Sequence, residues 1–329
     1  MKIEPSEPPA KRPHRKFKGT LANVSRSYKT DQFNRFQNLE DYQFIPSVNF
    51  HLWEPCNMRC KFCFATFQDV KQSILPKGHL PKGEALEVVQ ELASFGFQKI
   101  TFAGGEPTLC PWLPELIAAA KEAGMITTIV TNGSKLTDAF LKANRKNLDW
   151  IALSIDSLNP ETNLKMGRAI AGQKPLSVAY YKTLMESMKA MGFGIKINTV
   201  VNRANLSENM VDFICEAKPL RWKILQAIQI KGQNDGKISE FLISDNEFDA
   251  FIEMHHQVTS CTTLVPEPEN LIKGSYVMVD PAGRFFDDAS GIHRYSCKIL
   301  EVGCAQAIQQ IETDFGKFLK RGGLYQFSI

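Results

Sequence analysis

Long hydrophobic runs are missing from this sequence: nowhere in its 329 residues is there an apolar stretch of about 18, the length that a membrane-spanning helix needs. The first residues, MKIEPSEPPAKRPHRKFKG, also lack the apolar segment of a secretory signal, so we expect a cytoplasmic protein. An excess of one charge is missing too, because 39 Lys and Arg face 35 Asp and Glu. The net charge of +4 therefore neither requires nor excludes a polyanionic partner.

Cysteine is sparse, and its eight residues are too few for a disulfide scaffold in a chain of this length. Three of them lie close together, as Cys56, Cys60 and Cys63. In a reducing compartment, clustered thiols are more often metal ligands than disulfides, so we predict a metal site there. We predict packing roles as small buried hydrophobes for the other five, Cys110, Cys215, Cys261, Cys297 and Cys304.

Three regions follow one another along the chain. Residues 1–46 are rich in Pro, Lys and Arg and predict a solvated tail, with a binding arm as the alternative. Residues 47–260 alternate strand and helix patterns, and residues 261–329 form a C-terminal extension in which only a short strand, 276–279, is indicated. Strands are predicted at 48–53, 99–103, 126–131, 150–154, 194–200 and 223–228, and helices at 84–95, 114–123, 175–191 and after the capping pair Ser244 and Glu247.

The strand and helix pattern defines the fold class. Strand–helix–strand repeats form parallel sheets with right-handed crossovers, so we predict an α/β protein with a partial (β/α)6 TIM-like barrel. The C-terminal extension would complete the site. In such a barrel the functional residues gather in the loops at the carboxyl ends of the strands.

The cysteine cluster lies directly after the first predicted strand, in VNFHLWEPCNMRCKFCFATF at residues 48–67. Three thiolates can bind three irons of a [4Fe–4S] cluster and leave the fourth iron open, as catalytic metal sites do. Phe62, between the last two cysteines, would shield the cluster from water. A zinc site with a distant fourth ligand is the alternative, which is disfavoured because zinc sites usually pair two CxxC units.

This CxxxCxxC pattern resembles the radical S-adenosylmethionine (radical SAM) superfamily, and KITFAGGEP at residues 99–107 strengthens the resemblance. The resemblance implies a [4Fe–4S] cluster and S-adenosylmethionine as cofactors. Gly104 and Gly105 would let the backbone approach the ligand, and Glu106 would accept from the methionine amine. By the same resemblance, four further polar residues would contact the adenosyl ribose and the methionine carboxylate: Asn132, Ser154, Asp156 and Arg168.

Basic and polar residues recur along the predicted strands and near the C-terminus. They are Lys99, Thr101, Lys196, Asn198, Arg221, Lys223, Lys320 and Arg321, with Gly322 and Gly323 beside them. Side chains alternate along a strand, so Lys99 and Thr101 share one face. Cations inside a barrel need an anion, and a polyphosphate fits this set. Solvated or ion-paired charges at strand ends are the alternative.

With these segments in view, the resemblance narrows to the viperin family, through SVNFH at 47–51, KIN at 196–198, RWK at 221–223 and FLKRGGLY at 318–325. It implies a nucleoside triphosphate substrate, CTP favoured with UTP or GTP possible. Abstraction of its 4′ hydrogen and loss of the 3′ hydroxyl would give a 3′-deoxy-3′,4′-didehydro chain terminator with an antiviral or anti-phage role. Asn49 and Asn198 would orient the ribose, Tyr276 would relay a hydrogen or proton, and the tail glycines would form a lid.

The base preference is open, because Ala65, Thr101 and Ala103 depart from the vertebrate pattern, as in prokaryotic-type members. We expect an electron donor such as flavodoxin or ferredoxin, a monomer, and no direct contact with nucleic acid or membrane. One alternative is a GTP 3′,8-cyclase-like enzyme, which needs a second cluster and a CxxC pair that the C-terminal cysteines do not form. Another is a non-catalytic iron–sulfur or nucleotide-binding protein. His255 continues an apolar helix face, so we predict a core histidine.

Overall fold

The computed structural model describes residues 44–327, so most of the predicted tail at 1–46 lies outside the described residues. Within 44–327, ten strands form one sheet in the order β10-β9-β8-β1-β2-β3-β4-β5-β6-β7. The strands are β1 Ser47–Trp53, β2 Lys99–Gly104, β3 Ile126–Thr131, β4 Trp150–Ser154, β5 Gly194–Val201, β6 Arg221–Gln226, β7 Thr263–Glu267, β8 Val277–Val279, β9 Arg284–Asp287 and β10 Arg294–Lys298.

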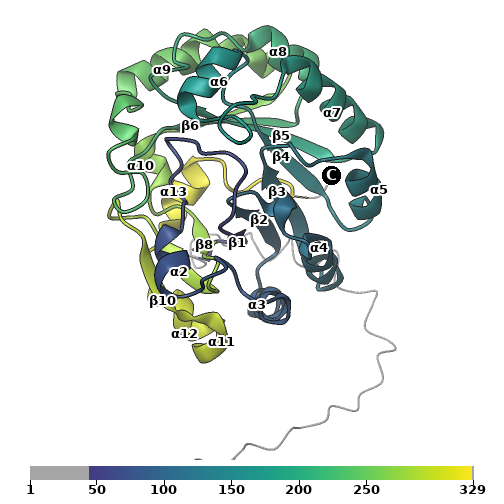
Figure 1. The fold of residues 1–329 in the computed structure, drawn as a ribbon, viewed down its shortest axis with the longest axis vertical. Coiled ribbons are helices and arrows are strands. Elements are labelled where there is room, and N and C mark those ends of the chain that lie inside the picture. Colours follow the sequence, from purple (N-terminus) through teal and green to yellow (C-terminus); the bar gives the residue numbers. More distant parts are fainter. Residues whose placement is uncertain (1–43, 328–329) are drawn as a thin grey trace, which may run out of the picture. The chain divides into compact units, whose positions relative to one another are not determined.

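The strands from β8 through β1 to β7 are parallel, whereas β9 and β10 are antiparallel to their neighbours. Figure 1 shows the longer helices along the outside of the curved sheet, from α3 through α4, α5, α7 and α8 to α9. The helices are α2 Gln68–Ser73, α3 Lys82–Phe95, α4 Leu113–Glu122, α5 Asp138–Asn144, α6 Pro160–Met166, α7 Val178–Ala190, α8 Val211–Ala217, α9 Asp245–Met254, α10 Glu269–Ile272, α11 Ile299–Val302, α12 Cys304–Ile308 and α13 Phe315–Lys320. The sheet ends at β7 and β10, which do not pair with each other, so the predicted partial barrel is confirmed.

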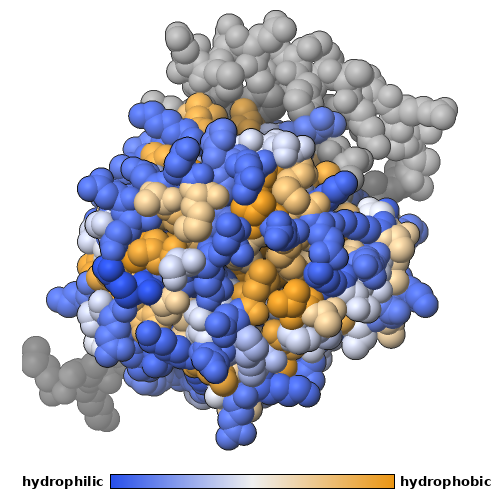
Figure 2. Space-filling view, turned by 90° about the horizontal axis from the view of Figure 1, so that it is seen from above, coloured by the Kyte–Doolittle hydropathy of each residue, from blue (hydrophilic) through white to orange (hydrophobic). Residues whose placement is uncertain are grey.

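The alternation of side chains along β1 separates the core from the site. Val48, Phe50 and Leu52 are buried in the hydrophobic core, whereas Asn49 and His51 line the inner side of the sheet. Hydrophilic side chains cover most of the outer face seen from above, with apolar side chains in separate small groups (Figure 2). The strand pattern therefore gives each strand one packing face and one face that is open to a ligand.

Most predicted element bounds agree with the structure within two residues, and 126–131 and 150–154 match β3 and β4. The helix predicted from Pro175 is wrong at its start: α7 begins at Val178, because the Ser177 hydroxyl caps it by accepting from the Tyr180 backbone N–H. The capping box of Ser244 and Glu247 at the start of α9 is confirmed. No helix in the described part of the chain is long and apolar enough to cross a membrane.

The prediction that the regular pattern ends near residue 259 is wrong. β7 pairs in parallel with β6 after helix α9, which adds another strand–helix–strand unit, and β8 returns to pair with β1. Pro266 weakens the strand signal of β7 in the sequence, whereas β8 agrees with the short strand indicated at 276–279. The inner side of the sheet is therefore lined by more strands than the six that we predicted.

Candidate active site

A cavity of about 440 Å³ lies on the inner side of the sheet. The strand register aligns its lining residues: Asn49 pairs with Thr101 across β1 and β2, and Asn198 pairs with Lys223 across β5 and β6. The predicted site residues that line it are Asn49, Cys56, Cys60, Phe62, Cys63, Lys99, Thr101, Gly104, Gly105, Glu106, Asn132, Ser154, Arg168, Lys196, Asn198, Arg221, Lys223, Tyr276, Arg321, Gly322 and Gly323.

Two predicted residues lie elsewhere. Lys320, at the end of α13, is exposed and is not part of the cavity lining. Asp156 is buried behind the lining, where its carboxylate binds the Arg168 Nε at 2.8 Å. Asp156 would therefore act on a ligand through Arg168, which also donates to the Ser154 carbonyl at 2.6 Å.

The three cysteines lie at one end of the cavity and are all partly exposed. Their loop is bonded to the segment after α6, since the Arg59 N–H donates to the Gly167 carbonyl and the Lys61 N–H to the Met166 carbonyl, at 3.1 and 2.9 Å. Gly167 has φ +75°, and a Cβ at this position would overlap the Arg59 carbonyl oxygen. This close backbone packing holds the cysteine loop against the barrel.

The donor set fits a cluster better than a single metal ion. Among the described residues, no three His, Cys, Asp or Glu side chains converge on one ion. A zinc ion needs every sulfur at about 2.3 Å from one point, whereas cysteines that bind different irons of a cube can stand further apart. Burial raises the pKa of Cys56 to about 11 and that of Cys63 to about 12, so binding iron must release their protons.

The turn after β2 packs against the cysteine loop. A Cβ on Gly104 would overlap the Trp53 carbonyl oxygen, and one on Gly105 would overlap the Glu54 carbonyl oxygen. The close approach of the neighbouring backbone therefore requires glycine at both positions, whether or not a ligand is bound. Glu106, 1% exposed, is the polar group that this turn places in the cavity wall.

Glu106 is held by donors at the end of β3. Its carboxylate accepts from the Thr131 hydroxyl at 2.6 Å and from the Asn132 backbone N–H at 2.8 Å. The Thr108 hydroxyl donates to it at 2.5 Å. A carboxylate with this many donors has a fixed orientation, as a binding site for a cationic amine requires.

Cations gather toward the other end of the strands. Lys99 and Lys196 are 8% and 4% exposed, and both donate to the Tyr325 hydroxyl, Lys99 at 2.8 Å. Arg221 stacks on the Tyr325 ring, with its Cζ at 4.1 Å from the ring centroid. Burial, reinforced by the charges of Lys223 and Arg321, lowers the pKa of Lys99 to about 7. Burial and the neighbouring cations also lower the pKa of Lys196 well below its usual value.

A single carboxylate, Glu267, compensates part of this charge. It is fully buried and binds Lys223 at 2.7 Å and Arg321 at 3.4 Å. Burial opposes its ionisation, but these two cations outweigh burial and hold the pKa of Glu267 below its usual value. The five basic side chains of this group outnumber the carboxylate, and a bound anion would favour their protonated forms.

Tyr276 connects the cations to the middle of the cavity. Its hydroxyl donates to Glu267 and accepts from the Lys223 ammonium at 2.7 Å. The Arg321 Cζ lies 3.6 Å from the centroid of its ring. Burial raises the pKa of Tyr276 well above its usual value, so the phenol keeps its proton.

Sequence reasoning missed three residues of the site. Tyr325 ends the FLKRGGLY motif, but no role was predicted for it from the sequence. Glu267 lies on β7, a strand that was not predicted. His51 lines the cavity at 5% exposure, and within the described residues neither of its ring nitrogens has a hydrogen-bond partner. Burial, with a smaller effect of His293, lowers the pKa of His51 to about 3, so the imidazole is neutral. Its alternation with Asn49 on β1 was the available signal.

The remaining cysteines only partly follow the prediction. Cys110 and Cys304 are buried as predicted. Cys215 and Cys261 pack against the core but also form a disulfide with Cα atoms 5.6 Å apart, which was not predicted. The packing role was wrong for Cys297, which is exposed.

The pairing of Cys261 with Cys215 leaves Cys297 and Cys304 as the only free C-terminal cysteines of the described residues, fewer than a second cluster of the GTP 3′,8-cyclase type would need. The prediction for His255 is confirmed. It is fully buried, accepts from the Met210 N–H at 3.0 Å and donates to the Phe251 carbonyl at 2.8 Å.

Comparisons with known proteins agree with this geometry. The Radical SAM superfamily matches residues 53–214. A Flammeovirga pacifica protein named "S-adenosylmethionine-dependent nucleotide dehydratase" is 53% identical over 283 residues, which cover 86% of this chain and 96% of that protein. A rainbow trout (Oncorhynchus mykiss) protein, "S-adenosylmethionine-dependent nucleotide dehydratase RSAD2", is 37% identical over 86% of this chain and 80% of its own length. This chain belongs to the viperin family of radical SAM nucleotide dehydratases.

A Lacinutrix mariniflava protein with the same name as the Flammeovirga pacifica protein is 62% identical over 86% of this chain, but the match spans only 59% of that protein. Solved structures share the fold at low sequence identity. The enzyme anSMEcpe with bound AdoMet has a TM-score of 0.61 at 13% identity and covers 84% of this chain and 82% of its own. Streptococcus suis SuiB bound to S-adenosylmethionine has a TM-score of 0.58 at 17% identity and covers 80% and 66%. As a viperin-family radical SAM protein, the chain has a [4Fe–4S] cluster and S-adenosylmethionine as its cofactors.

Proposed function

We propose that this chain converts a nucleoside triphosphate, CTP in preference to UTP or GTP, into its 3′-deoxy-3′,4′-didehydro derivative. The proposal rests on one observation: the basic residues Lys99, Lys196, Arg221, Lys223 and Arg321, which we call the cation group, line the same cavity as the cysteine loop. Asn198 lies two residues along β5 from Lys196, and Thr101 two residues along β2 from Lys99. The rise of a strand separates each pair by about 7 Å. A triphosphate bound by the cations would place its ribose beside these polar side chains.

The cluster and S-adenosylmethionine, when bound, supply a 5′-deoxyadenosyl radical. Cys56, Cys60 and Cys63 would hold the cluster, with Phe62 excluding water. Glu106 would bind the methionine amine and Arg168 the carboxylate, with the adenosyl ribose near Asn132 and Ser154. These assignments rest on the orientation of Glu106 by β3 and of Arg168 by Asp156.

The chain's own groups position the substrate. Lys99, Lys196, Arg221, Lys223 and Arg321 would bind the phosphate oxygens, and the Gly322–Gly323 backbone would close over them. Gly322 already packs at this end, since its carbonyl accepts from the Arg221 guanidinium at 2.9 Å. Asn49, Thr101 and Asn198 would orient the ribose so that its 4′ hydrogen faces the cofactor.

Tyr276 would supply the proton that the leaving 3′ hydroxyl needs. The C3′–O bond breaks, the hydroxyl leaves as water, and one further electron from the external donor completes the 3′,4′ double bond. Lys223, 2.7 Å from the phenol oxygen, can return a proton to it. His51 would donate one hydrogen bond to the substrate and accept another, because a neutral imidazole carries one donor and one acceptor.

The product lacks the 3′ hydroxyl that a polymerase extends, which supports the proposed role in antiviral or anti-phage defence. We further propose a cytoplasmic monomer, supplied with electrons by a flavodoxin or ferredoxin. Anaerobic incubation of the reconstituted protein with S-adenosylmethionine, dithionite and each nucleoside triphosphate tests the assignment. CTP should raise 5′-deoxyadenosine the most. If no triphosphate raises it above the substrate-free background, the assignment is wrong.

A further inference from the structure

Three segments meet around the outside of the cysteine loop. The loop is bonded to the segment after α6 through Arg59 and Lys61, as described, and the Ala171 N–H donates to the Asn57 carbonyl at 2.9 Å. The Asn57 amide also donates to the Ser134 hydroxyl at 2.8 Å. Residues 56–67, 132–137 and 162–175 thus form one continuous surface over the proposed cluster.

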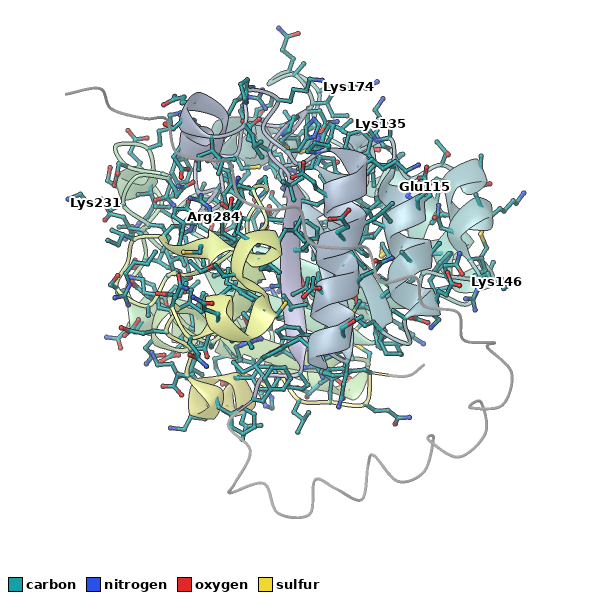
Figure 3. The ribbon with its side chains drawn as sticks, turned by 90° about the horizontal axis from the view of Figure 1, so that it is seen from below. Glu115, Lys135, Lys146, Lys174, Lys231 and Arg284 are labelled. Atoms are coloured by element: carbon teal, nitrogen blue, oxygen red, sulfur yellow. A yellow bond between two sulfur atoms is a disulfide. The ribbon has the colours of Figure 1, made fainter. Side chains whose placement is uncertain are left out.

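This surface carries more positive than negative charge, since only two exposed carboxylates, Asp138 and Glu161, lie directly beside its segments. Its three segments contain no Asp or Glu. Their exposed cations, which we call the basic collar, are Arg59, Lys61, Lys135, Lys165 and Lys174. In Figure 3, Lys135 and Lys174 project from the same end of the molecule, far from Lys146.

The collar cations have no carboxylate partner in the described part of the chain. Arg59 bends back onto backbone carbonyls of its own loop, including Met58 at 2.8 Å. Lys61 lies over the Phe241 ring, 5.7 Å from its centroid. Unpaired like charges that are kept close together repel one another, so a surface partner of opposite charge would stabilise them.

We propose that the basic collar is the docking surface for a small acidic one-electron carrier protein of the flavodoxin or ferredoxin type. This inference rests on the proposed function, because a radical reaction needs an electron at the cluster. Electron transfer weakens steeply with distance, and two collar residues, Arg59 and Lys61, belong to the same loop as the three partly exposed cysteines. In the step itself, the carrier loses one electron and the cluster gains it, and no covalent bond forms or breaks.

The charge distribution favours an acidic protein over a small reductant. The whole chain has a net charge of only +4, yet five exposed cations and only two exposed carboxylates, Asp138 and Glu161, lie on or directly beside these three segments. Complementary charge raises the association rate of two proteins by about 10- to 1,000-fold at low ionic strength, and salt screens the effect. A small uncharged or cationic reductant would gain nothing from the collar.

The test uses the full chain with its cluster reconstituted, and compares two triple variants of equal charge change. K135E/K165E/K174E reverses the collar. K142E/K146E/K189E is the control and reverses three exposed lysines near the amino ends of β4 and β5. Stopped-flow absorbance follows cluster reduction by reduced flavodoxin without any nucleotide. Dithionite-reduced methyl viologen, a small cation, is the second reductant.

At low salt, we expect flavodoxin to reduce the collar variant about tenfold more slowly than the wild type, and this rate should depend less on salt. The reduction rate of the control variant should change by less than about twofold. Methyl viologen should reduce the wild type and the control at similar rates and should not be slower with the collar variant. Equal slowing in both triple variants, or no slowing in the collar variant, overturns the proposal.

Iron content checks that each variant holds its cluster, and K135E/K174E serves if the triple variant loses it. Because the readout needs no substrate, it is independent of the nucleotide chemistry. A chain that is reduced normally but converts no triphosphate would refute the proposed function and leave the docking surface intact.

Discussion

The two buried lysines of the cation group predict that triphosphate binding is coupled to proton uptake. Lys99 and Lys196 both donate to the Tyr325 hydroxyl and face Arg221, Lys223 and Arg321, with Glu267 as the compensating carboxylate. The pKa of Lys99 is lowered to about 7, first by burial and then by the neighbouring cations. A bound triphosphate supplies negative charge that favours the ammonium form, so each lysine takes up a proton on binding.

The size of the effect follows from this pKa. At pH 8, a lysine with a pKa of about 7 is protonated in roughly a tenth of the molecules. Above that pH, each lysine that must take up a proton lowers the observed affinity by up to about tenfold per pH unit, or about 1.4 kcal/mol. Lys99 alone therefore predicts a loss of up to about tenfold between pH 8 and pH 9, and the lowered pKa of Lys196 acts in the same direction.

The sign for stability is opposite. The folded-state pKa of Lys99 is below its unfolded value of about 10.4, so the unfolded chain binds more protons between these two values. The stability of the ligand-free protein should therefore rise with pH from about 7 to about 10. Chemical denaturation across this range measures it.

Isothermal titration calorimetry of CTP binding without reductant, in buffers of different ionisation enthalpy, counts the protons directly. We expect uptake of about one proton, that of Lys99, at pH 8.5, where the triphosphate itself no longer titrates. Lys99→Met should lower that number and weaken binding, whereas Lys146→Met, on the exposed surface, should change neither. An affinity that stays constant from pH 8 to pH 9, with no proton uptake, would show that the buried lysines are not protonated when the triphosphate binds.

Three further perturbations test other parts of the site. Glu267→Gln should lower the free energy of unfolding by about 3 kcal/mol, because it leaves buried cations unpaired. Saturating CTP should restore part of that stability. An equal loss with and without CTP would show that the triphosphate does not bind these cations. Cys60→Ala should abolish the brown cluster absorbance after reconstitution, and an unchanged spectrum would exclude the cysteine site. Tyr276→Phe should keep CTP binding and 5′-deoxyadenosine formation but lower the yield of the didehydro product at least about tenfold, and an unchanged ratio of the two products would remove Tyr276 from the proton path.

Much of the barrel was predictable because local patterns determine it. The runs at 126–131 and 150–154 alternate or repeat apolar residues between clear helix ends, and β3 and β4 have those bounds. The cysteine spacing and the GGEP turn are likewise local. They predicted which residues share the cavity, because the carboxyl ends of parallel strands meet at one edge of the sheet.

What the sequence did not reveal depends on contacts between distant segments. Tyr325 lies 226 residues from Lys99, and only the folded tail brings its hydroxyl to the lysine pair. Glu267 is on β7, whose proline masks the strand pattern. Cys215 and Cys261 are 46 residues apart, so spacing alone could not pair them. Lys320 was predicted as a site residue because it precedes Arg321 in the sequence, but its side chain lies on the exposed surface.

The central claim is that the ribose of a nucleoside triphosphate, held between the cation group and the cysteine loop, loses its 4′ hydrogen to the adenosyl radical. The most direct measurement is anaerobic turnover with 4′-deuterated CTP, followed by mass spectrometry of 5′-deoxyadenosine. We expect one deuterium in 5′-deoxyadenosine for each didehydro product formed. Product with unlabelled 5′-deoxyadenosine, or label appearing only from CTP deuterated at another carbon, would contradict it.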